Sequence, residues 1–467
     1  MLRLPTCILS LVVLAMAHPG EHIEARAPEK PIAAAWYAGW HAADFPLSAV
    51  SWSKYTHMTY AFGVTTPDPN IIGLDISDEN RLPQFVSSAH NHSVKALLSV
   101  GGWTGSRYFS TAVGSAKNRT AFAKAITSIL QKYDLDGIDF DWEYPGKQGI
   151  GCNIVNPNDT SNFLLLLQQL RQDTTLKRTL VLTAAVYVTP FADNTGEPSS
   201  DIAGFADVLD YIAIMNYDLK SNTAIGVGPS SPLDDSCAPD GAKLGSAVSS
   251  VAAWSNAGIP NNKLVLGVGA YGHSYDISSA VALSQTNSSS LNSYPSYTPN
   301  SRSLGDRWDG DSGVDVCGVM QAPGGVYTYW GLIEEGFLKS DGSAGEGIAL
   351  RYDDCSETPF AYNATSQVYV SYENPRSFAA KGDFIHSNGL AGFAMWEAGG
   401  DYHDVLLDSI KNASQNGNPG SRTQKASLVS GTSSKGSSSA ASTRPASLVF
   451  VLLPALVFLS TLMSVST

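Results

Sequence analysis

Eight short runs of apolar, β-prone residues constrain the fold of this chain more than any other feature of its sequence. They recur between residues 27 and 409, and amphipathic helical patterns at 117–133 and 161–173 separate two pairs of them. Eight buried strands with helices between them are what a (β/α)8 TIM barrel requires, and a doubly wound open sheet is the alternative. The predicted strands are 32–36, 57–62, 94–100, 137–142, 180–187, 208–215, 263–269 and 389–396.

The interval between the seventh and eighth runs is far too long for one connecting helix. We therefore expect a small α+β insertion domain at 275–360, with the barrel formed by 27–274 and 361–411. Ser161 is expected to cap the helix at 161–173, because a Ser side chain can accept a hydrogen bond from a free amide group at a helix start.

The first 17 residues are typical of a secretory signal peptide, with a basic residue, an apolar run and a small-x-small cleavage pattern before His18. Secretion would place the remaining four cysteines in an oxidising compartment, where an even count favours disulfides. Three pairings are possible. We expect Cys152–Cys237 and Cys317–Cys355, which group barrel loops with barrel loops and insertion with insertion.

The end of the chain changes composition. Residues 412–443 are rich in Ser, Thr, Gly and Asn and are expected to form an extended stalk, since they offer few apolar groups to bury. In the tail, 444–467, the apolar stretch 448–463 is short for a membrane span and follows small residues and a polar spacer. This order favours a GPI-anchor signal, and a tail-anchoring helix is the alternative.

Six N-x-S/T sequons mark candidate glycosylation sites, which in a secreted chain would lie on the surface. They are at Asn91, Asn118, Asn158, Asn287, Asn363 and Asn412.

Charge and composition narrow the class of ligand. The formal net charge is −13, which argues against a nucleic acid partner because such partners require basic patches. Aromatic residues make up 10% of the chain, including nine Trp, and aromatic rings stack on the apolar faces of sugars. Most of these rings could equally be core residues. The balance suits a neutral ligand such as a carbohydrate.

The most informative segment is DGIDFDWEY at 136–144. Because side chains alternate along a strand, Asp139, Asp141 and Glu143 point to one side and apolar residues to the other. In a barrel this acidic face would line the interior up to the C-terminal mouth, where barrel enzymes hold their active sites. Crowded carboxyl groups cannot all be ionised, so Glu143, last in the row, is the natural proton donor. A solvated strand face or a calcium site is the alternative.

With this row the chain resembles glycoside hydrolase family 18, the chitinase family. The family signature DxxDxDxE is met by Asp136, Asp139, Asp141 and Glu143. Other segments are similar to the family in the order of its strands, at 60–62, 99–103, 215–218, 263–272 and 395–396. The resemblance covers nearly all of the predicted barrel and includes the insertion.

The resemblance implies substrate-assisted hydrolysis with retention of configuration. Glu143 would protonate the glycosidic oxygen while the 2-acetamido carbonyl of the substrate attacks the anomeric carbon. Asp141 would orient the acetamide N–H with Asp139 behind it, and Tyr217 would hold the acetamido oxygen. No metal or cofactor is implied.

Eight further residues match cleft positions of the family, although most of them could instead belong to the core. They are Tyr37, Phe62, Trp103, Tyr144, Met215, Asp218, Tyr271 and Trp396, the last as the platform under the sugar. His273 stands where the family often has Arg, which puts one distal sugar contact in doubt.

The predicted protein is therefore a secreted chitinase of GPI-anchored fungal type, acting as a monomer on chitin or chitooligosaccharides at the outer cell surface or cell wall. An endo-β-N-acetylglucosaminidase or a transglycosylase on the same scaffold is one alternative. A non-catalytic chitin-binding lectin is another, and the presence of Glu143 argues against it.

Overall fold

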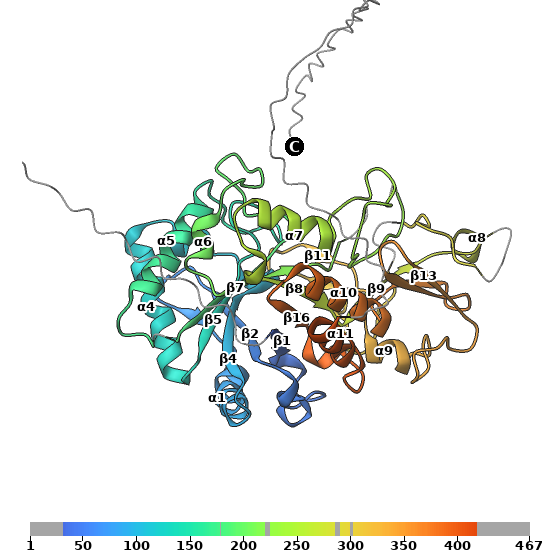
Figure 1. The fold of residues 1–467 in the computed structure, drawn as a ribbon, viewed down its shortest axis with the longest axis horizontal. Helices are drawn as coiled ribbons and strands as arrows, with labels where there is room; N and C mark the ends of the chain where they lie inside the picture. Colours follow the sequence, from blue (N-terminus) through green and yellow to red (C-terminus); the bar gives the residue numbers. More distant parts are fainter. Residues whose placement is uncertain (1–30, 178, 220–224, 285–289, 299–301, 418–467) are drawn as a thin grey trace, which may run out of the picture. The chain divides into compact units, whose positions relative to one another are not determined.

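The computed structural model of the protein describes residues 31–177, 179–219, 225–284, 290–298 and 302–417. Eight parallel strands form a closed ring within them, since β1 pairs with both β16 and β2 (Figure 1). In chain order the barrel strands are β1 (Ile32–Ala38), β2 (His57–Thr65), β4 (Lys95–Gly101), β5 (Gly137–Asp141), β6 (Val181–Val186), β7 (Tyr211–Met215), β8 (Leu264–Gly269) and β16 (Gly392–Trp396). The ring confirms the predicted (β/α)8 TIM barrel and excludes the open sheet. The short strand β3 (Ile72–Gly73) pairs antiparallel with the end of β2.

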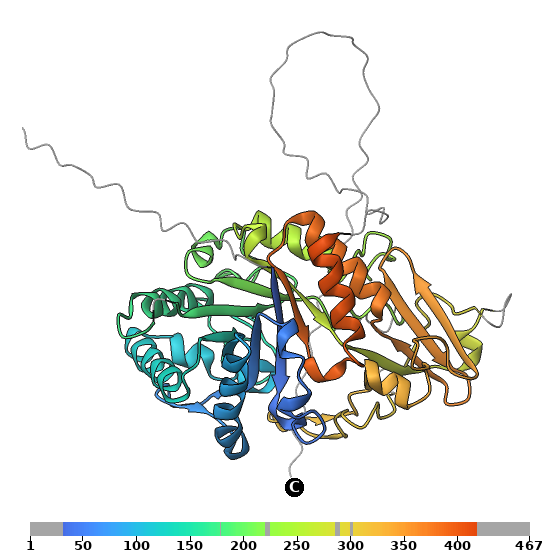
Figure 2. The same cartoon turned by 60° about the horizontal axis from the view of Figure 1, so that its bottom comes forward.

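Helices cover the outside of the barrel. In Figure 1, α4, α5 and α6 lie to the left of the strands, and Figure 2 shows the orange-red helices α10 and α11 side by side. The helices of the barrel are α1 (Ile76–Asn91), α2 (Gly102–Gly105), α3 (Phe109–Val113), α4 (Ala116–Tyr133), α5 (Asp159–Gln172), α6 (Ala203–Ala206), α7 (Ala247–Asn256), α10 (Pro375–Asn388) and α11 (Val405–Asn416).

The predicted starts of one helix and of the stalk were wrong. Helix α5 begins at Asp159, so Ser161 lies inside the helix and does not cap it. The Asp159 carboxylate is buried and accepts hydrogen bonds from Ser110 Oγ at 2.7 Å and Asn156 N at 2.9 Å, which fixes the helix start. The stalk predicted from residue 412 starts too early, because helix α11 continues to Asn416 and buries Ser414. The rest of the predicted stalk, the tail and the signal segment lie outside the described residues.

The barrel has two apolar layers, as alternation along buried strands requires. On β5, Ile138 and Phe140 point outward into the large core beneath the helices. The inner cluster of the barrel contains few large aliphatic groups and many methyl groups. Its alanines are Ala34, Ala61, Ala185, Ala213, Ala391 and Ala394. These small side chains leave room inside the ring for Trp36 and Tyr211, which belong to the same cluster.

A five-stranded antiparallel sheet occupies the interval between β8 and β16, on the right in Figure 1. Its strands in spatial order are β12 (Val326–Thr328), β9 (Tyr271–Asp276), β15 (Val368–Ser371), β14 (Thr358–Asn363) and β13 (Ile348–Asp353). Two short helices, α8 (Ser279–Ala282) and α9 (Tyr329–Glu334), and the hairpin of β10 (Gly313–Val314) and β11 (Met320–Gln321) complete this segment. The predicted insertion range, 275–360, was too short, because the inserted sheet begins with β9 at Tyr271 and includes β15, which ends at Ser371.

Both disulfides connect the barrel to this inserted segment. They join Cys152 to Cys317 and Cys237 to Cys355, with Cα–Cα distances of 5.6 and 6.4 Å. The predicted pairing was therefore wrong. The inserted segment folds back against two barrel loops, so each barrel cysteine meets one from the insertion.

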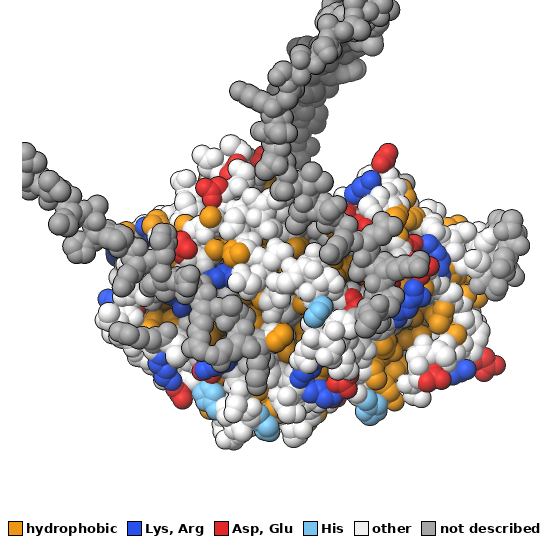
Figure 3. All heavy atoms as spheres, in the orientation of Figure 1, with side chains coloured by type: hydrophobic (Ala, Val, Ile, Leu, Met, Phe, Trp, Pro, Cys, Tyr) orange, Lys and Arg blue, Asp and Glu red, His pale blue; other side chains and the backbone are white. Residues whose placement is uncertain are grey.

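Charged side chains are dispersed on one face of the molecule. On the face shown in Figure 3, basic side chains lie scattered among acidic ones rather than in one patch. This face therefore does not present the basic surface that a polyanion requires. Among the described residues, no helix has the length and apolar character needed to span a membrane.

Candidate active site

Three carboxyl groups project into the barrel from β5 and the residues that follow it. Asp139, Asp141 and Glu143 are 2%, 6% and 9% exposed, so the row faces the interior and not bulk solvent. Asp141 and Glu143 lie in the wall of a large cleft at the C-terminal ends of the strands. The alternation predicted from sequence thus brings all three acids to one place.

Asp139, the deepest of the three, is held by hydroxyl and indole donors from three different strands. Trp36 Nε1 and Ser99 Oγ donate to its Oδ2 at 3.1 and 2.8 Å, and Thr183 Oγ1 donates to Oδ1 at 2.6 Å. Burial raises the pKa of Asp139, and these three hydrogen bonds oppose the rise. The donors therefore stabilise charge on a carboxyl group that water does not reach.

Asp141 and Glu143 hold protons above the usual pH range of carboxyl groups. Burial first, and then the Glu143 and Asp139 carboxylates, raise the pKa of Asp141 well above its ordinary value. Burial also raises the pKa of Glu143 to about 7, with the Asp218 carboxylate adding to the rise and a hydrogen bond with Tyr144 opposing it. A group with this pKa can both give and take a proton near neutral pH. The pair is therefore suited to general acid and base chemistry.

Tyr217 and Asp218 follow β7 and reach the same cleft. Tyr217 is 8% exposed, and its ring centroid lies 6.2 Å from that of Tyr271. Asp218 has a left-handed backbone, with φ of 58°, which turns its side chain toward Tyr271 Oη at 2.9 Å and His273 Nε2 at 2.5 Å. His273, which stands where the family often has Arg, therefore contacts the Asp218 carboxylate at the cleft wall.

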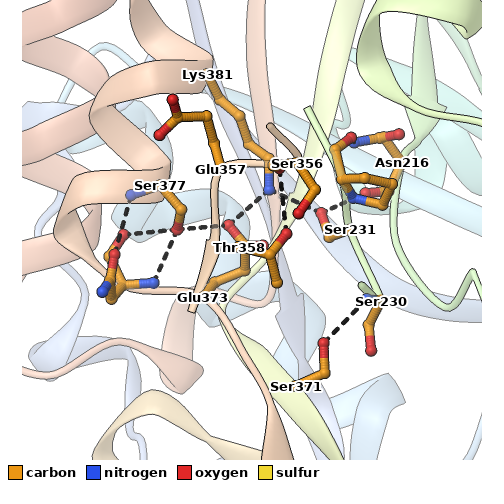
Figure 4. A network of polar contacts seen from close by, with 12 residues as sticks. Asn216, Ser230, Ser231, Ser356, Glu357, Thr358, Ser371, Glu373, Ser377 and Lys381 are labelled. Atoms are coloured by element: carbon orange, nitrogen blue, oxygen red, sulfur yellow. Dashed lines mark hydrogen bonds and ion pairs between the residues drawn. The ribbon is translucent and has the colours of Figure 1, made fainter. Parts of the chain in front are cut away.

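A buried polar network supports the loop that carries Tyr217 (Figure 4). Lys381 and Glu373, with side chains 0% and 2% exposed, form an ion pair at 2.6 Å. Lys381 Nζ also donates to Ser231 Oγ at 2.9 Å, and Ser231 Oγ donates to the carbonyl oxygen of Asn216 at 2.5 Å. Asn216 immediately precedes Tyr217, so the ion pair of Lys381, which lies on α10, with Glu373 is connected to the active-site loop by two hydrogen bonds.

The cleft above the acids has a volume of about 1160 Å³. It is lined by the predicted residues Phe62, Trp103, Tyr144, Met215, Tyr217, Asp218, Tyr271 and Trp396, together with Asp141 and Glu143. Phe62 stacks on Trp396, with ring centroids 5.6 Å apart and planes at 21°. The apolar floor and the carboxyl groups thus belong to one surface.

Tyr37 is not part of this surface, so its predicted role in the cleft was wrong. It is 1% exposed and points outward into the helix-facing core, where its hydroxyl donates to Phe45 O at 3.0 Å. Its neighbour Trp36 takes the inward position instead and lines the cleft. On a buried strand only one of two successive side chains can face the interior.

Several cleft residues escaped the sequence analysis. They are Trp36, Trp40, His41, Tyr187, Trp308 and Glu397, among others. Tyr187 could have been found from strand parity, since it ends the predicted strand 180–187. Trp308 lies on the inserted segment and stacks on His41, with ring centroids 3.9 Å apart. No local pattern in the sequence indicates this contact.

Comparison with known proteins defines the family of this chain. The model of glycosyl hydrolases family 18 matches residues 33–401. The chain belongs to glycoside hydrolase family 18.

This family 18 protein is similar to a chitinase-like effector of Moniliophthora roreri, at 46% identity over 409 residues, which cover 88% of this chain and 98% of that one. It is also similar to the solved chitinase RmChi1 of Rhizomucor miehei, with 30% identity, a TM-score of 0.73 and coverage of 82% and 99%. A class V chitinase of Nicotiana tobaccum in complex with NAG4 has the same fold, with 20% identity, a TM-score of 0.65 and coverage of 83% and 100%.

The sequons of this family 18 protein differ in accessibility. Asn91, Asn158 and Asn412 are exposed, while Asn118 and Asn363 are half-buried. Asn118 Nδ2 donates to Thr111 O at 2.8 Å, so a glycan there would displace an existing contact. Asn287 lies outside the described residues. Glycosylation at these positions stays a prediction.

Proposed function

We propose that this family 18 protein is a chitinase that hydrolyses β-1,4 linkages between N-acetylglucosamine units. The observation that carries the proposal is the buried row of Asp139, Asp141 and Glu143 below an aromatic-lined cleft of about 1160 Å³. Its last carboxyl group has a pKa of about 7, as a proton donor at neutral pH requires. The similarity to the chitinase of Rhizomucor miehei supports the same substrate class.

In the proposed reaction Glu143 gives its proton to the glycosidic oxygen as the bond from that oxygen to the anomeric carbon breaks. The acetamido oxygen of the same sugar forms a new bond to the anomeric carbon, which gives an oxazolinium ion. Water then attacks the anomeric carbon, and the bond between this carbon and the acetamido oxygen breaks. One proton of the water goes to Glu143, which restores the acid. Asp141 stabilises the positive charge of the intermediate, and Tyr217 holds the acetamido oxygen.

A second candidate function is binding of chitin oligomers without hydrolysis. It is favoured by the 46% identity to a protein named a chitinase-like effector. Against it stands the complete set of acids, because a binding protein gains nothing from three buried carboxyl groups whose pKa values are all raised by burial. An endo-β-N-acetylglucosaminidase or a transglycosylase would use the same residues.

Digestion of N-acetylglucosamine oligomers of defined length separates these functions. Hydrolysis predicts shorter oligomers, transglycosylation predicts longer ones, and a binding protein leaves the substrate intact. An N-glycoprotein substrate tests the endo-acting alternative. Proton NMR of the first products tests the mechanism: a β-anomer supports retention, and an initial α-anomer contradicts it.

We further propose that the protein is secreted and held at a fungal-type cell surface by a GPI anchor, where it would act on the wall. The predicted signal segment and tail motivate this proposal. Release of the protein from intact cells by a phosphoinositide-specific phospholipase tests it. A protein that stays on the cells after this treatment contradicts the anchor.

A further inference from the structure

The hydrogen-bonded ladder of β5 stops before the proton donor. Pairing with β4 ends at Gly101 and Asp141, and pairing with β6 ends at Phe140 and Ala184. Glu143 lies two residues past the last ladder pair, so its peptide N–H and C=O have no neighbouring strand to bind. Buried peptide groups require partners from elsewhere.

Two buried side chains supply these partners from opposite sides. Glu143 N donates to Ser106 Oγ at 3.0 Å. The single proton of this hydroxyl has two acceptors within reach, Gly102 O at 2.8 Å and Asp141 O at 2.9 Å. On the other side Asn153 Nδ2 donates to Glu143 O at 2.7 Å. Ser106 and Asn153 are 0% and 5% exposed. The two side chains thus provide the hydrogen bonds that neighbouring strands provide within the sheet.

Asn153 is itself fixed by its surroundings. Gln148 Nε2 donates to the main-chain carbonyl oxygen of Asn153 at 2.8 Å, and the main-chain N–H of Ile154 donates to Arg107 O at 3.0 Å. The preceding residue, Cys152, is bonded to Cys317 of the inserted segment. A covalent connection therefore runs from the insertion to within one residue of the side chain that holds Glu143.

We propose that Ser106 and Asn153 are positioning residues for Glu143, and that the Cys152–Cys317 disulfide holds Asn153 in place. The inserted segment then influences the position of the proton donor Glu143 as well as the shape of the cleft. This inference rests on the proposed function, since its effect is on the transfer of a proton from Glu143. Neither residue contacts the substrate in this scheme, so substrate affinity should not depend on them.

The first test replaces Ser106 and Asn153 separately by Ala. A misplaced catalytic group costs roughly 10- to 100-fold in rate, so kcat should fall by that factor while KM for a chitooligosaccharide stays nearly constant. The pH at which kcat/KM falls should also move, because the surroundings of the acid change. Asn292→Ala is the matched control, since Asn292 Nδ2 also donates to a backbone carbonyl, Val281 O at 2.9 Å, far along the inserted segment. A full wild-type kcat in both Ser106→Ala and Asn153→Ala overturns the inference.

The two disulfides provide a second matched comparison. Their sequence separations, 165 and 118, are similar enough that removing either should cost similar stability. The inference predicts that Cys152→Ser/Cys317→Ser lowers kcat severalfold more than Cys237→Ser/Cys355→Ser at a temperature where both variants are folded. Equal losses in the two double variants contradict the role of the first disulfide.

Hydrogen–deuterium exchange decides the inference without any assay of turnover. The peptide that contains residues 141–144 should exchange faster in Ser106→Ala and in Cys152→Ser/Cys317→Ser than in wild type, and no faster in Cys237→Ser/Cys355→Ser. Unchanged exchange in the first two variants contradicts positioning. A wild-type protein that leaves oligomers intact instead contradicts the proposed function, and the exchange result stands separately.

Discussion

Trp36 donates its indole N–H to Asp139 at 3.1 Å, so a ring on β1 fixes a carboxyl group on β5. The same ring lines the cleft and lies 6.0 Å from Trp396, centroid to centroid. One side chain therefore contacts both the proposed sugar platform and the deepest acid of the row.

Replacing Trp36 by Phe should lower kcat about tenfold. The variant keeps an aromatic ring but removes one donor to Asp139, and a hydrogen bond to a charged group contributes about 1.5–3 kcal/mol. Trp52→Phe is the control, because Trp52 is similarly buried and donates to Leu47 O at 3.0 Å outside the cleft. Steady-state kinetics on a chitooligosaccharide measures both variants, and equal rates in the two would show that the Asp139 contact does not matter.

Glu143→Gln should abolish turnover and leave sugar binding largely intact. The amide keeps the shape of the side chain but has no acidic proton, and general acid catalysis contributes about 10²- to 10⁴-fold. Calorimetry with an oligomer and an activity assay measure the two effects. Glu346→Gln, at an exposed position of the inserted segment, should behave like wild type. Substantial turnover by Glu143→Gln would refute the assignment of the acid.

The pH profile of kcat/KM should fall on its alkaline side near pH 7. The pKa of Glu143 is raised from 4.5 to about 7, so the group keeps its proton up to that pH and loses it above. Only the protonated form can serve as the general acid. A profile that stays flat from pH 7 to pH 9 would mean that another group donates the proton.

Stability should respond to the same group in a defined direction. Because the pKa of Glu143 is higher in the folded state, protonation stabilises the fold fully below pH 4.5, and this contribution is lost as the pH rises through about 7. Glu143→Gln should therefore be more stable than wild type at pH 8, by about 1–3 kcal/mol, with a smaller difference at pH 5. Thermal unfolding at the two pH values measures this, and a variant less stable than wild type at pH 8 would contradict it.

The stability of the fold should depend on Lys381 and Glu373 being paired with each other and not on the presence of either charge alone. Lys381→Met leaves a buried carboxylate without its partner, which typically costs about 3–5 kcal/mol. Lys381→Met/Glu373→Gln should recover most of that loss, as chemical denaturation can measure. Lys177→Met, which breaks an exposed pair with Asp134, should have little effect. A double variant as unstable as Lys381→Met alone would mean that the charges themselves are not the source of the loss.

Local alternation explains why the acids of β5 could be predicted. Three carboxyl groups on one side of an apolar strand leave only one arrangement with the charges at the mouth of a barrel. Strand β1 gives no such sign, because all seven of its residues are buried and none is charged. Parity alone could not decide whether Trp36 or Tyr37 faces the interior, and the resemblance favoured the outward residue.

The disulfide pairing depended on contacts that no local pattern describes. Cys317 meets Cys152 only because the hairpin of β10 and β11 lies against the loop after β5, at a sequence separation of 165. The position of Trp308 in the cleft and the contact of Lys381 with Ser231 also depend on residues that are far apart in the sequence. Such long-range contacts follow from how the insertion and the last helices pack on the barrel.

The alanines inside the ring also bear on how deep a substrate can sit. Barrels of this architecture commonly fill their centre with branched side chains, whereas here methyl groups at positions such as Ala185 and Ala213 pack in the same cluster as Met215 and Tyr217. Replacing one of these alanines with a larger residue would make the cleft shallower without altering any of the three acids. The size of ligand that the cleft accepts thus depends on alanines that do not themselves line it.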